Sequence, residues 1–170
     1  CIRDRAKVLH VIKGLDAGGA EQLLVLAARH RDTAAFDYEV AFLLPGHEAR
    51  RGAIEAEGVP TTCLRGTPWW DPRWVWRLRR HLRGRSVDVV HAHSPLVAVG
   101  ARLAARALPS DERPAVVVTL HNMWASHHRA VRLLDRATCH LDDLRLAVSE
   151  AVRRSLPAAV RSAVVTTIHG

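Results

Sequence analysis

Cysteine is scarce in this chain of 170 residues. Three cysteines cannot all pair with one another, and Cys1, Cys63 and Cys139 do not show the short spacing of zinc ligands. A disulfide framework and a zinc ribbon are therefore not expected, and a reducing, cytoplasmic setting fits this cysteine content best. The chain also lacks an apolar run near the roughly 18 residues of a membrane-spanning helix, and no secretory signal sequence opens it.

Motifs of several enzyme classes are missing as well. No G-x-G-x-x-G follows the first predicted strand, and the second predicted strand ends without an acidic residue, so dinucleotide binding is not expected. The sequence G-K-[ST] is absent, which argues against a P-loop ATPase. Neither G-x-S-x-G nor a Ser–His–Asp order is present, so hydrolase chemistry has no support.

Positive charge comes almost entirely from arginine and is concentrated in one segment. Lys7 and Lys13 are the only lysines among 25 basic residues, and 17 acidic residues leave a net charge of +8. Without the six arginines of segment 73–85 the net charge would be +2. This local excess indicates either an anionic partner or a solvated helix face. The six are Arg73, Arg77, Arg79, Arg80, Arg83 and Arg85.

The rest of the composition is that of a globular domain, with 48% apolar and 25% charged residues. Short β-branched runs alternate with apolar residues at helical spacing. The predicted strands are 7–12, 37–44, 61–64, 87–91, 115–120, 144–148 and 163–168. The first predicted helix begins near residue 20, and the others cover 47–57, 72–83, 95–107, 126–141 and 150–159.

This alternation predicts an α/β fold: a doubly wound, mainly parallel, Rossmann-like sheet with helices on both faces. We expect one domain over residues 7–170, preceded by a non-native or disordered leader at 1–6. The chain opens on Cys1 rather than methionine and stops directly after the last predicted strand. We therefore expect a fragment of a longer protein.

Glycines follow the first predicted strand. In doubly wound sheets, ligands bind beyond the carboxyl ends of the strands. Gly18 and Gly19 stand there and open a helix, where free backbone N–H groups favour an anion such as a diphosphate. A tight turn into the helix would need the same glycines, so the two interpretations stay open.

Histidines and serines follow the later strands. His91 and His93 could bind a metal, but no third ligand lies at short spacing, so we expect no metal. Ser94 and Ser149 can cap the helices that they precede. His121, at the end of the fifth strand, could donate, accept or shuttle a proton near neutral pH, or simply bond to the backbone.

The order of these segments resembles the amino-terminal domain of family 4 glycosyltransferases, which have the GT-B fold. The matching segments cover nearly the whole chain in the right order and spacing. They are VLHVIKGLDAGGAEQLLVLAA, VDVVHAHSPLVAVGARLAA, VVVTLHN, RLAVSEAVRRSL and VVTTIHG. G-G-A-E and H-x-H-S-P are only moderately specific singly, whereas the ordered set is specific.

The resemblance implies an enzyme with two Rossmann-like domains that face each other across a cleft. Such an enzyme moves a sugar from a nucleotide-sugar donor to an acceptor hydroxyl, with retention at the anomeric carbon and without a metal or other cofactor. This chain would be the acceptor-binding half, and the C-terminal donor-binding domain would be absent. We therefore expect no transfer by the chain alone.

The resemblance also carries roles over to particular residues. His121 would lie close to the transferred sugar as the catalytic residue, and Gly18 and Gly19 would lie near the donor phosphates. Six further residues would border the acceptor or substrate: Glu21, His93, Ser94, Asn122, Ser149 and Glu150.

Tryptophans accompany the arginine-rich segment. On an amphipathic helix, this combination can lie in an anionic membrane surface, which would place the protein at the inner face of a membrane. The candidate contacts are Trp69, Trp70, Arg73, Arg77 and Arg80. The stripe formed by Trp74, Leu78 and Leu82 would equally serve to pack the helix onto the sheet.

Two alternatives remain beside the transferase. A nucleotide-sugar epimerase half would have the same fold, although the G-G-A-E loop and the A-V-S-E segment favour the transferase. A basic surface-binding module would use the arginine segment to bind anionic membrane or nucleic acid. Nucleic acid is not expected as a partner, because base-stacking aromatics on a sheet face and a known binding motif are both missing.

Overall fold

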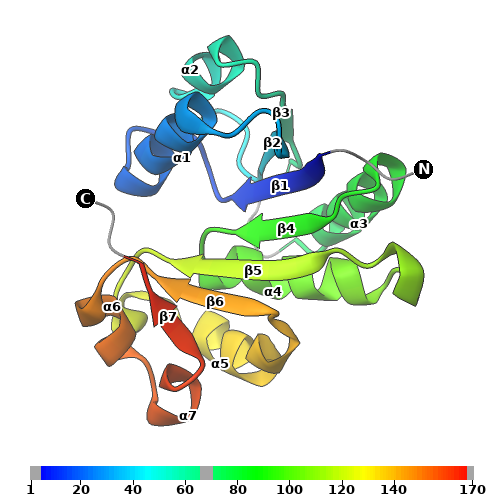
Figure 1. Cartoon of the computed structure of the whole chain (residues 1–170). Coiled ribbons are helices and arrows are strands. Elements are labelled where there is room, and N and C mark those ends of the chain that lie inside the picture. The colour runs from blue at the N-terminus through cyan, green and yellow to red at the C-terminus, as the bar shows by residue number, and fades with distance from the viewer. Residues whose placement is uncertain (1–4, 66–70, 168–170) are drawn as a thin grey trace.

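The computed structural model describes residues 5–65 and 71–167. Their strands form one seven-stranded sheet, in which every pairing is parallel and the order is β3-β2-β1-β4-β5-β6-β7 (Figure 1). The strands are β1 Ala6–Ile12, β2 Phe36–Phe42, β3 Thr61–Cys63, β4 Val89–Ala92, β5 Ala115–Leu120, β6 Leu144–Ala147 and β7 Val164–Thr166. The predicted doubly wound α/β fold is confirmed, with the reversal of strand order between β1 and β4.

Helices connect the strands. They are α1 Gly19–His30, α2 Arg51–Ala56, α3 Arg73–Arg85, α4 Pro95–Arg106, α5 Arg129–Thr138, α6 Glu150–Ser155 and α7 Ala158–Arg161. The described residues also form three short 3-10 turns, η1 Ser110–Glu112, η2 Trp124–Ser126 and η3 Cys139–Leu141. Within the described residues, no helix is long and apolar enough to span a bilayer.

Two predicted helices differ from those of the structure. The helix predicted over 150–159 is divided into α6 and α7, because Pro157 disfavours helical backbone at Leu156, which is extended (φ −76°, ψ 149°). The helix predicted over 126–141 is shorter, since 3-10 turns precede and follow α5.

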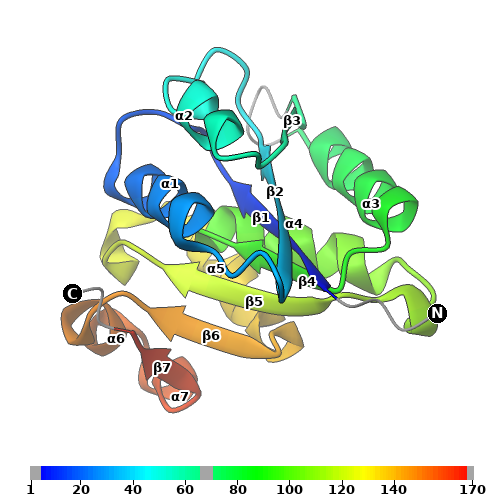
Figure 2. The same cartoon turned by 45° about the horizontal axis from the view of Figure 1, so that its top comes forward.

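Helices cover the two faces of the sheet unequally. Side chains of α3, α4 and α6 pack with alternate strand residues such as Leu9, Val90 and Val118 on one face. On the opposite face, α1 and α2 pack only on β1–β3 (Figures 1 and 2). In the described part of the chain no helix covers that face of β6 and β7, where Leu144 and Val165 are 41% and 53% exposed.

The predicted apolar stripe of α3 is part of the core. Trp74, Leu78 and Leu82 are all buried, and the Trp74 ring lies against α4 at Gly100. A Cβ at Gly100 would overlap the Trp74 ring, so glycine is needed there for close approach of the two helices. The stripe therefore serves packing.

A buried ionic cluster joins α4, α5 and β6 on the face that α4 covers. Arg102 donates to both carboxylate oxygens of Asp142 (2.6 and 2.7 Å) and to Asp135 Oδ1 (2.9 Å). Arg145 also donates to Asp135, so two cations face two carboxylates. Burial alone would lower the pKa of Arg102, but Asp142 and Asp135 raise it above its ordinary value. Charge balance is what makes this burial tolerable.

Candidate functional site

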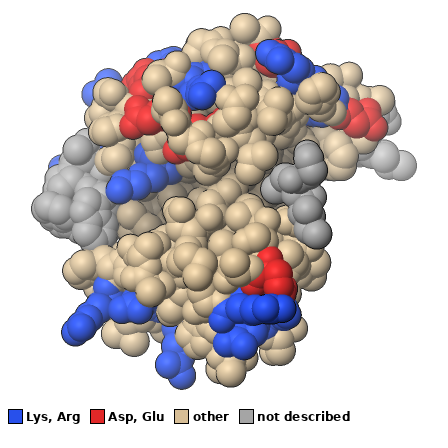
Figure 3. All heavy atoms as spheres, turned by 90° about the vertical axis from the view of Figure 1, so that its left-hand side faces the viewer, with Lys and Arg blue, Asp and Glu red and all other residues tan. Residues whose placement is uncertain are grey.

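A cleft of about 910 Å³ opens at the carboxyl ends of β1, β4 and β5, beside the reversal of strand order. Its walls come from the start of α1, the turn between β4 and α4, and the segment from His121 to Val131. Figure 3 looks onto this side of the molecule, which is hollowed across its middle, with charged side chains mainly above and below the hollow. The fold therefore places a ligand-sized space where parallel sheets usually bind their ligands.

The glycine turn forms one wall of this cleft. Gly18 precedes the first residue of α1 and accepts a hydrogen bond from the backbone N–H of Gln22 (3.0 Å). A Cβ at Gly18 would overlap a carboxylate oxygen of Glu21, whereas a Cβ at Gly19 would meet no atom within 4 Å. The carboxylate of Glu21 therefore lies over the turn, beside the N–H groups of the helix start, in space that a side chain at position 18 could enter only by displacing it.

The segment between β1 and α1 is held by the segment after β2. Leu15 donates its N–H to the carbonyl of His47 (2.7 Å), and Arg50 donates to the carbonyl of Leu15 (2.7 Å). His47 also pairs with Asp16. Residues 47–50, predicted as the first turn of a helix, instead lie ahead of α2 and fix the glycine turn.

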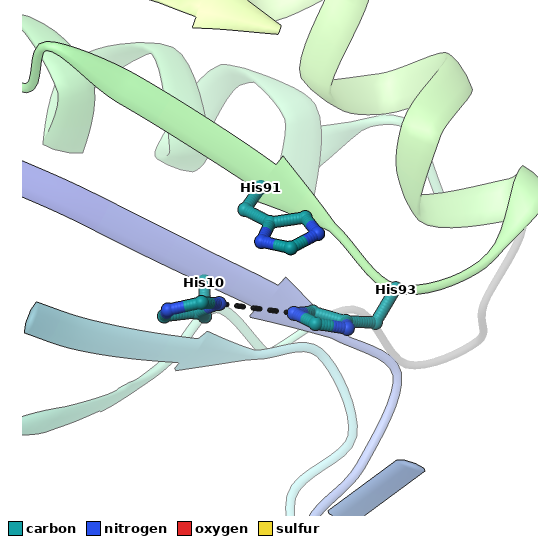
Figure 4. Close-up of side chains that lie close together, drawn as sticks. All are labelled: His10, His91 and His93. Carbon is teal, nitrogen blue, oxygen red and sulfur yellow. Dashed lines mark hydrogen bonds between the residues drawn. The ribbon is translucent and has the colours of Figure 1, made fainter. Parts of the chain in front are cut away.

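Histidines form a hydrogen-bonded chain beneath the opposite wall. His10 Nδ1 lies 3.0 Å from His93 Nε2, and His93 Nδ1 lies 3.1 Å from His121 Nε2. His10 and His91 are direct partners in the register of β1 and β4, so their side chains share one face of the sheet. His91 stacks on His93 with ring centroids 4.4 Å apart (Figure 4) and bonds through Nε2 to Thr119 Oγ1 at 2.7 Å.

Burial keeps these imidazoles neutral. Desolvation, helped by neighbouring histidines, lowers the pKa of His10 to about 3 and that of His91 to about 4. The pKa of His93 is lowered well below its ordinary value for the same reasons. At pH 7 each ring therefore has one N–H and one lone pair.

His10 corrects one argument from the sequence, because it is a third histidine beside the His91-x-His93 pair. Ring nitrogens of these three residues lie within 4.8 Å of one another, as a metal site would require. Their planes, however, differ by only 29° to 40°. Imidazole lone pairs lie in the ring plane, so nearly parallel rings do not direct them at one point. The arrangement suits stacking better than coordination.

The sequence-predicted residues divide into two groups. Those that line the cleft are Gly18, Gly19, Glu21, His93, Ser94, His121 and Asn122. Ser94 also caps α4 by accepting from the N–H of Val97 (3.4 Å). Ser149 caps α6 through Val152, and Glu150 binds Arg153 and Arg154, so the structure gives this pair local roles outside the lining.

Sequence reasoning missed other parts of the lining. Lys13 brings a positive charge to the glycine wall, and Ser126, His127 and His128 add polar side chains opposite it. Lys13 directly follows the first predicted strand, so the carboxyl-end rule could have found it. The 3-10 turn η2 places Ser126, and apolar periodicity has no signal for such a turn.

The arginine-rich helix lies away from the cleft lining. Arg73, Trp76, Arg80 and Arg83 form its outward face, on which the Trp76 side chain is 60% exposed. Arg77 instead donates to the carbonyls of Leu64 and Arg65 (3.0 and 2.7 Å), which ties α3 to the end of β3. Two further predicted membrane contacts, Trp69 and Trp70, lie outside the described residues.

Comparison with known families gives a match over most of the chain. The family model described as Glycosyltransferase Family 4 matches residues 17–170. The chain belongs to Glycosyltransferase Family 4. This family domain includes the glycine turn, the His91–Ser94 segment and His121, so all of the cleft lining except Ile12 and Lys13 lies within the matched region. The comparison with curated proteins gives no match.

Solved structures show the same fold at low identity. Anabaena HepE, solved in complex with UDP and glucose, is 20% identical with a TM-score of 0.71, and the match covers 97% of this chain and 44% of HepE. The lipopolysaccharide outer core galactosyltransferase WaaB is 12% identical with a TM-score of 0.69, over 94% of this chain and 44% of WaaB. A UDP-N-acetylglucosamine 2-epimerase is 16% identical with a TM-score of 0.61, over 96% and 48%.

These likenesses confirm a Rossmann-like domain of the GT-B type. The chain spans about 44% of the length of HepE and of WaaB. A galactosyltransferase, WaaB, and an epimerase share the architecture, so the fold by itself does not decide between the two reactions.

Proposed function

We propose that this domain binds the acceptor, and part of the donor, in a retaining glycosyltransferase that uses a nucleotide-diphosphate sugar. The observation that carries the proposal is the pairing of two walls across one cleft. One wall is the glycine turn at the start of α1, and the other contains His121. HepE, solved with UDP and glucose, supports a nucleotide-sugar donor.

Each wall has a chemical role in this proposal. Gly18 and Gly19 let the donor diphosphate approach the N–H groups at the start of α1, with the Lys13 ammonium on the same wall. His121 and Asn122 hydrogen-bond hydroxyls of the transferred sugar, while His93, Ser94 and Glu21 lie toward the acceptor. No protein nucleophile and no metal is invoked; the departing phosphate takes the proton of the incoming hydroxyl.

We expect the chain alone to bind a nucleotide sugar weakly and not to catalyse transfer, because a second, donor-binding domain would supply most of the donor contacts. Backbone amide NMR of the labelled chain with millimolar UDP, GDP, UDP-glucose and GDP-mannose tests the binding claim. We expect shifts at Gly18, Gly19, His121 and Asn122 with at least one ligand. Shifts confined to α3, or none at the cleft with any of the four, would refute it.

The epimerase remains the second candidate, because an epimerase shares the fold over 96% of this chain. Product analysis with UDP-N-acetylglucosamine, on a protein that joins this domain to its second domain, separates the two reactions. An epimerase converts this substrate without any acceptor, whereas a transferase leaves its sugar unchanged until an acceptor hydroxyl is supplied. Acceptor-free conversion would therefore replace the transferase proposal.

We further propose that the outward face of α3 contacts an anionic membrane from the cytoplasmic side. The supporting observation is that an exposed tryptophan, Trp76, lies among Arg73, Arg80 and Arg83. Sedimentation with anionic vesicles at low salt should therefore bring down the chain, and Arg80→Glu should weaken this more than Arg106→Glu, the same charge change at the exposed end of α4. No sedimentation, or equal effects of the two variants, would exclude this contact.

A further inference from the structure

The histidine chain has a direction that the structure constrains. Its three rings, His10, His93 and His121, are joined by two N···N contacts of 3.0 and 3.1 Å, and each contact needs one N–H and one lone pair. A neutral ring supplies one of each. Because His10 and His93 are neutral, the protons point either from His10 toward the cleft or from His121 toward the core.

The inner end of the histidine chain, at His10, decides between the two directions of the protons. His10 Nε2 is buried and has no hydrogen-bond partner among the described residues. If the protons pointed toward the core, His10 would carry its N–H on Nε2, and a buried donor would have no acceptor. The ring contact with Tyr38 (centroids 4.8 Å apart, planes at 73°) offers at most a weak N–H···π interaction in its place. Buried N–H groups without an acceptor are rarer in proteins than under-used acceptors.

We infer that His10 donates through Nδ1 to His93, that His93 donates through Nδ1 to His121, and that His121 therefore carries its own proton on Nδ1. The Nε2 lone pair of His121 is used by His93 in this arrangement. The ring on the cleft wall then has its N–H at Nδ1 and no lone pair left to accept a proton. His10 and His93 act on the cleft as positioning residues, which fix both the tautomer and the orientation of His121.

What these tautomers mean for catalysis rests on the proposed function, whereas the assignment of the tautomers does not. In a sugar-transfer cleft, a fixed N–H donor would bind a hydroxyl or phosphate oxygen as a hydrogen-bond acceptor. It would not serve as a base, since the lone pair of the same ring is already occupied. His10, which does not line the cleft, would in this way control its chemistry from two hydrogen bonds away.

Nitrogen-15 NMR of the imidazoles tests the direction without any ligand. Long-range proton–nitrogen correlation at pH 7.5 distinguishes a protonated from an unprotonated Nδ1 or Nε2 in each ring. We expect Nδ1–H in His10, His93 and His121. Nε2–H in His121 together with Nε2–H in His93 would show the opposite direction and overturn the inference. Because no sugar nucleotide is present, this outcome is independent of the fate of the proposed function.

A variant pair tests whether His10 acts at a distance. In His10→Phe the inner donor is lost, so the tautomer ratio of His121 should shift toward Nε2–H by about tenfold, the equivalent of one hydrogen bond. His10→Asn should restore the wild-type ratio, because its amide nitrogen is as many bonds from Cα as imidazole Nδ1. His91→Phe is the matched control, since it removes a ring that stacks on His93 but is not one of the three hydrogen-bonded histidines.

The other possible outcomes also test the positioning role of His10 and the alternative of a metal site. An unchanged His121 tautomer in folded His10→Phe would remove the positioning role. If His10→Phe does not fold, His10→Asn and the wild-type spectrum still report the direction. Adding one equivalent of Zn²⁺ should leave the His10 and His93 signals in place, and a stoichiometric shift of both would assign them to a metal site instead.

Discussion

Two buried polar clusters lie on opposite faces of the same sheet, and they differ in how their polarity is compensated. The arginine cluster (Arg102, Asp135, Asp142, Arg145) balances two cations against two carboxylates beneath α4 and α5. The histidine cluster (His10, His91, His93, His121) is neutral where it is buried and reaches the cleft wall. Burial of polar groups alone therefore does not mark a candidate site; the histidine cluster is a candidate because it reaches the cleft.

Removal of Arg102 should have the largest effect on stability. Arg102→Ala leaves Asp135 and Asp142 buried without their main cation, so the free energy of unfolding should fall by about 3–5 kcal/mol. Urea denaturation measures this change. Arg106→Ala, one turn further along α4 and exposed, is the matched control and should change stability by less than about 0.5 kcal/mol. A loss below about 1 kcal/mol in Arg102→Ala would contradict a structural role for the arginine cluster.

Acidification should act mainly through the histidine cluster. Its three buried rings have a lower pKa in the folded chain than in the unfolded chain, so the unfolded chain binds more protons below about pH 6.5. Stability is therefore fully present above pH 6.5 and is lost as pH falls toward 4. Each ring contributes about 1.4 kcal/mol per pH unit in that window, or roughly 3–4 kcal/mol in all by pH 5.5.

The slope of stability against pH checks this assignment. Urea midpoints at pH 7.5, 6.5 and 5.5 should fall less steeply in His10→Phe, by about one ring's share. An unchanged slope would show that His10 is not a neutral buried group in the folded chain.

Two threonine variants, each of which removes one hydrogen bond, compare how much such a bond stabilises each cluster. Thr138 accepts from Arg102 Nη1 (2.8 Å), and Thr119 bonds to the neutral His91 (2.7 Å). Hydrogen bonds to charged groups are the stronger, so Thr138→Val should destabilise by about 2 kcal/mol and Thr119→Val by about 1 kcal/mol. The reverse order in urea denaturation would break the proposed distinction between a charged and a neutral cluster.

Gly18→Ala should change the cleft more than the fold. The new methyl would displace the flexible carboxylate of Glu21, so stability should change by less than about 1 kcal/mol. Nucleotide-sugar binding at the turn should weaken, because the N–H groups of the α1 start become less accessible. Gly19→Ala, which has open space around its new Cβ, is the control. Equal binding by the wild type and Gly18→Ala in an NMR titration would argue against phosphate contact there.

Much of the fold could be predicted from the sequence, because β-branched runs and helical spacing are local signals. The carboxyl-end rule also brought Gly18, His93 and His121 to one cleft. His10 could not be found in the same way, since its partners depend on the pairing of β1 with β4, which lie about 80 residues apart. Arg102 was missed because arginine on a predicted helix is normally assigned to solvent.

The most direct test of the account follows both clusters in one sample. Imidazole and guanidinium nitrogen signals of the labelled chain can be recorded while a nucleotide sugar, such as UDP-glucose, is added to millimolar concentration. We expect the His121 and His93 signals to move with ligand while the Arg102 Nε signal stays in place. Movement of the Arg102 signal with unmoved histidine signals would be the opposite result, since the ligand-binding cluster would then be on the other face of the sheet.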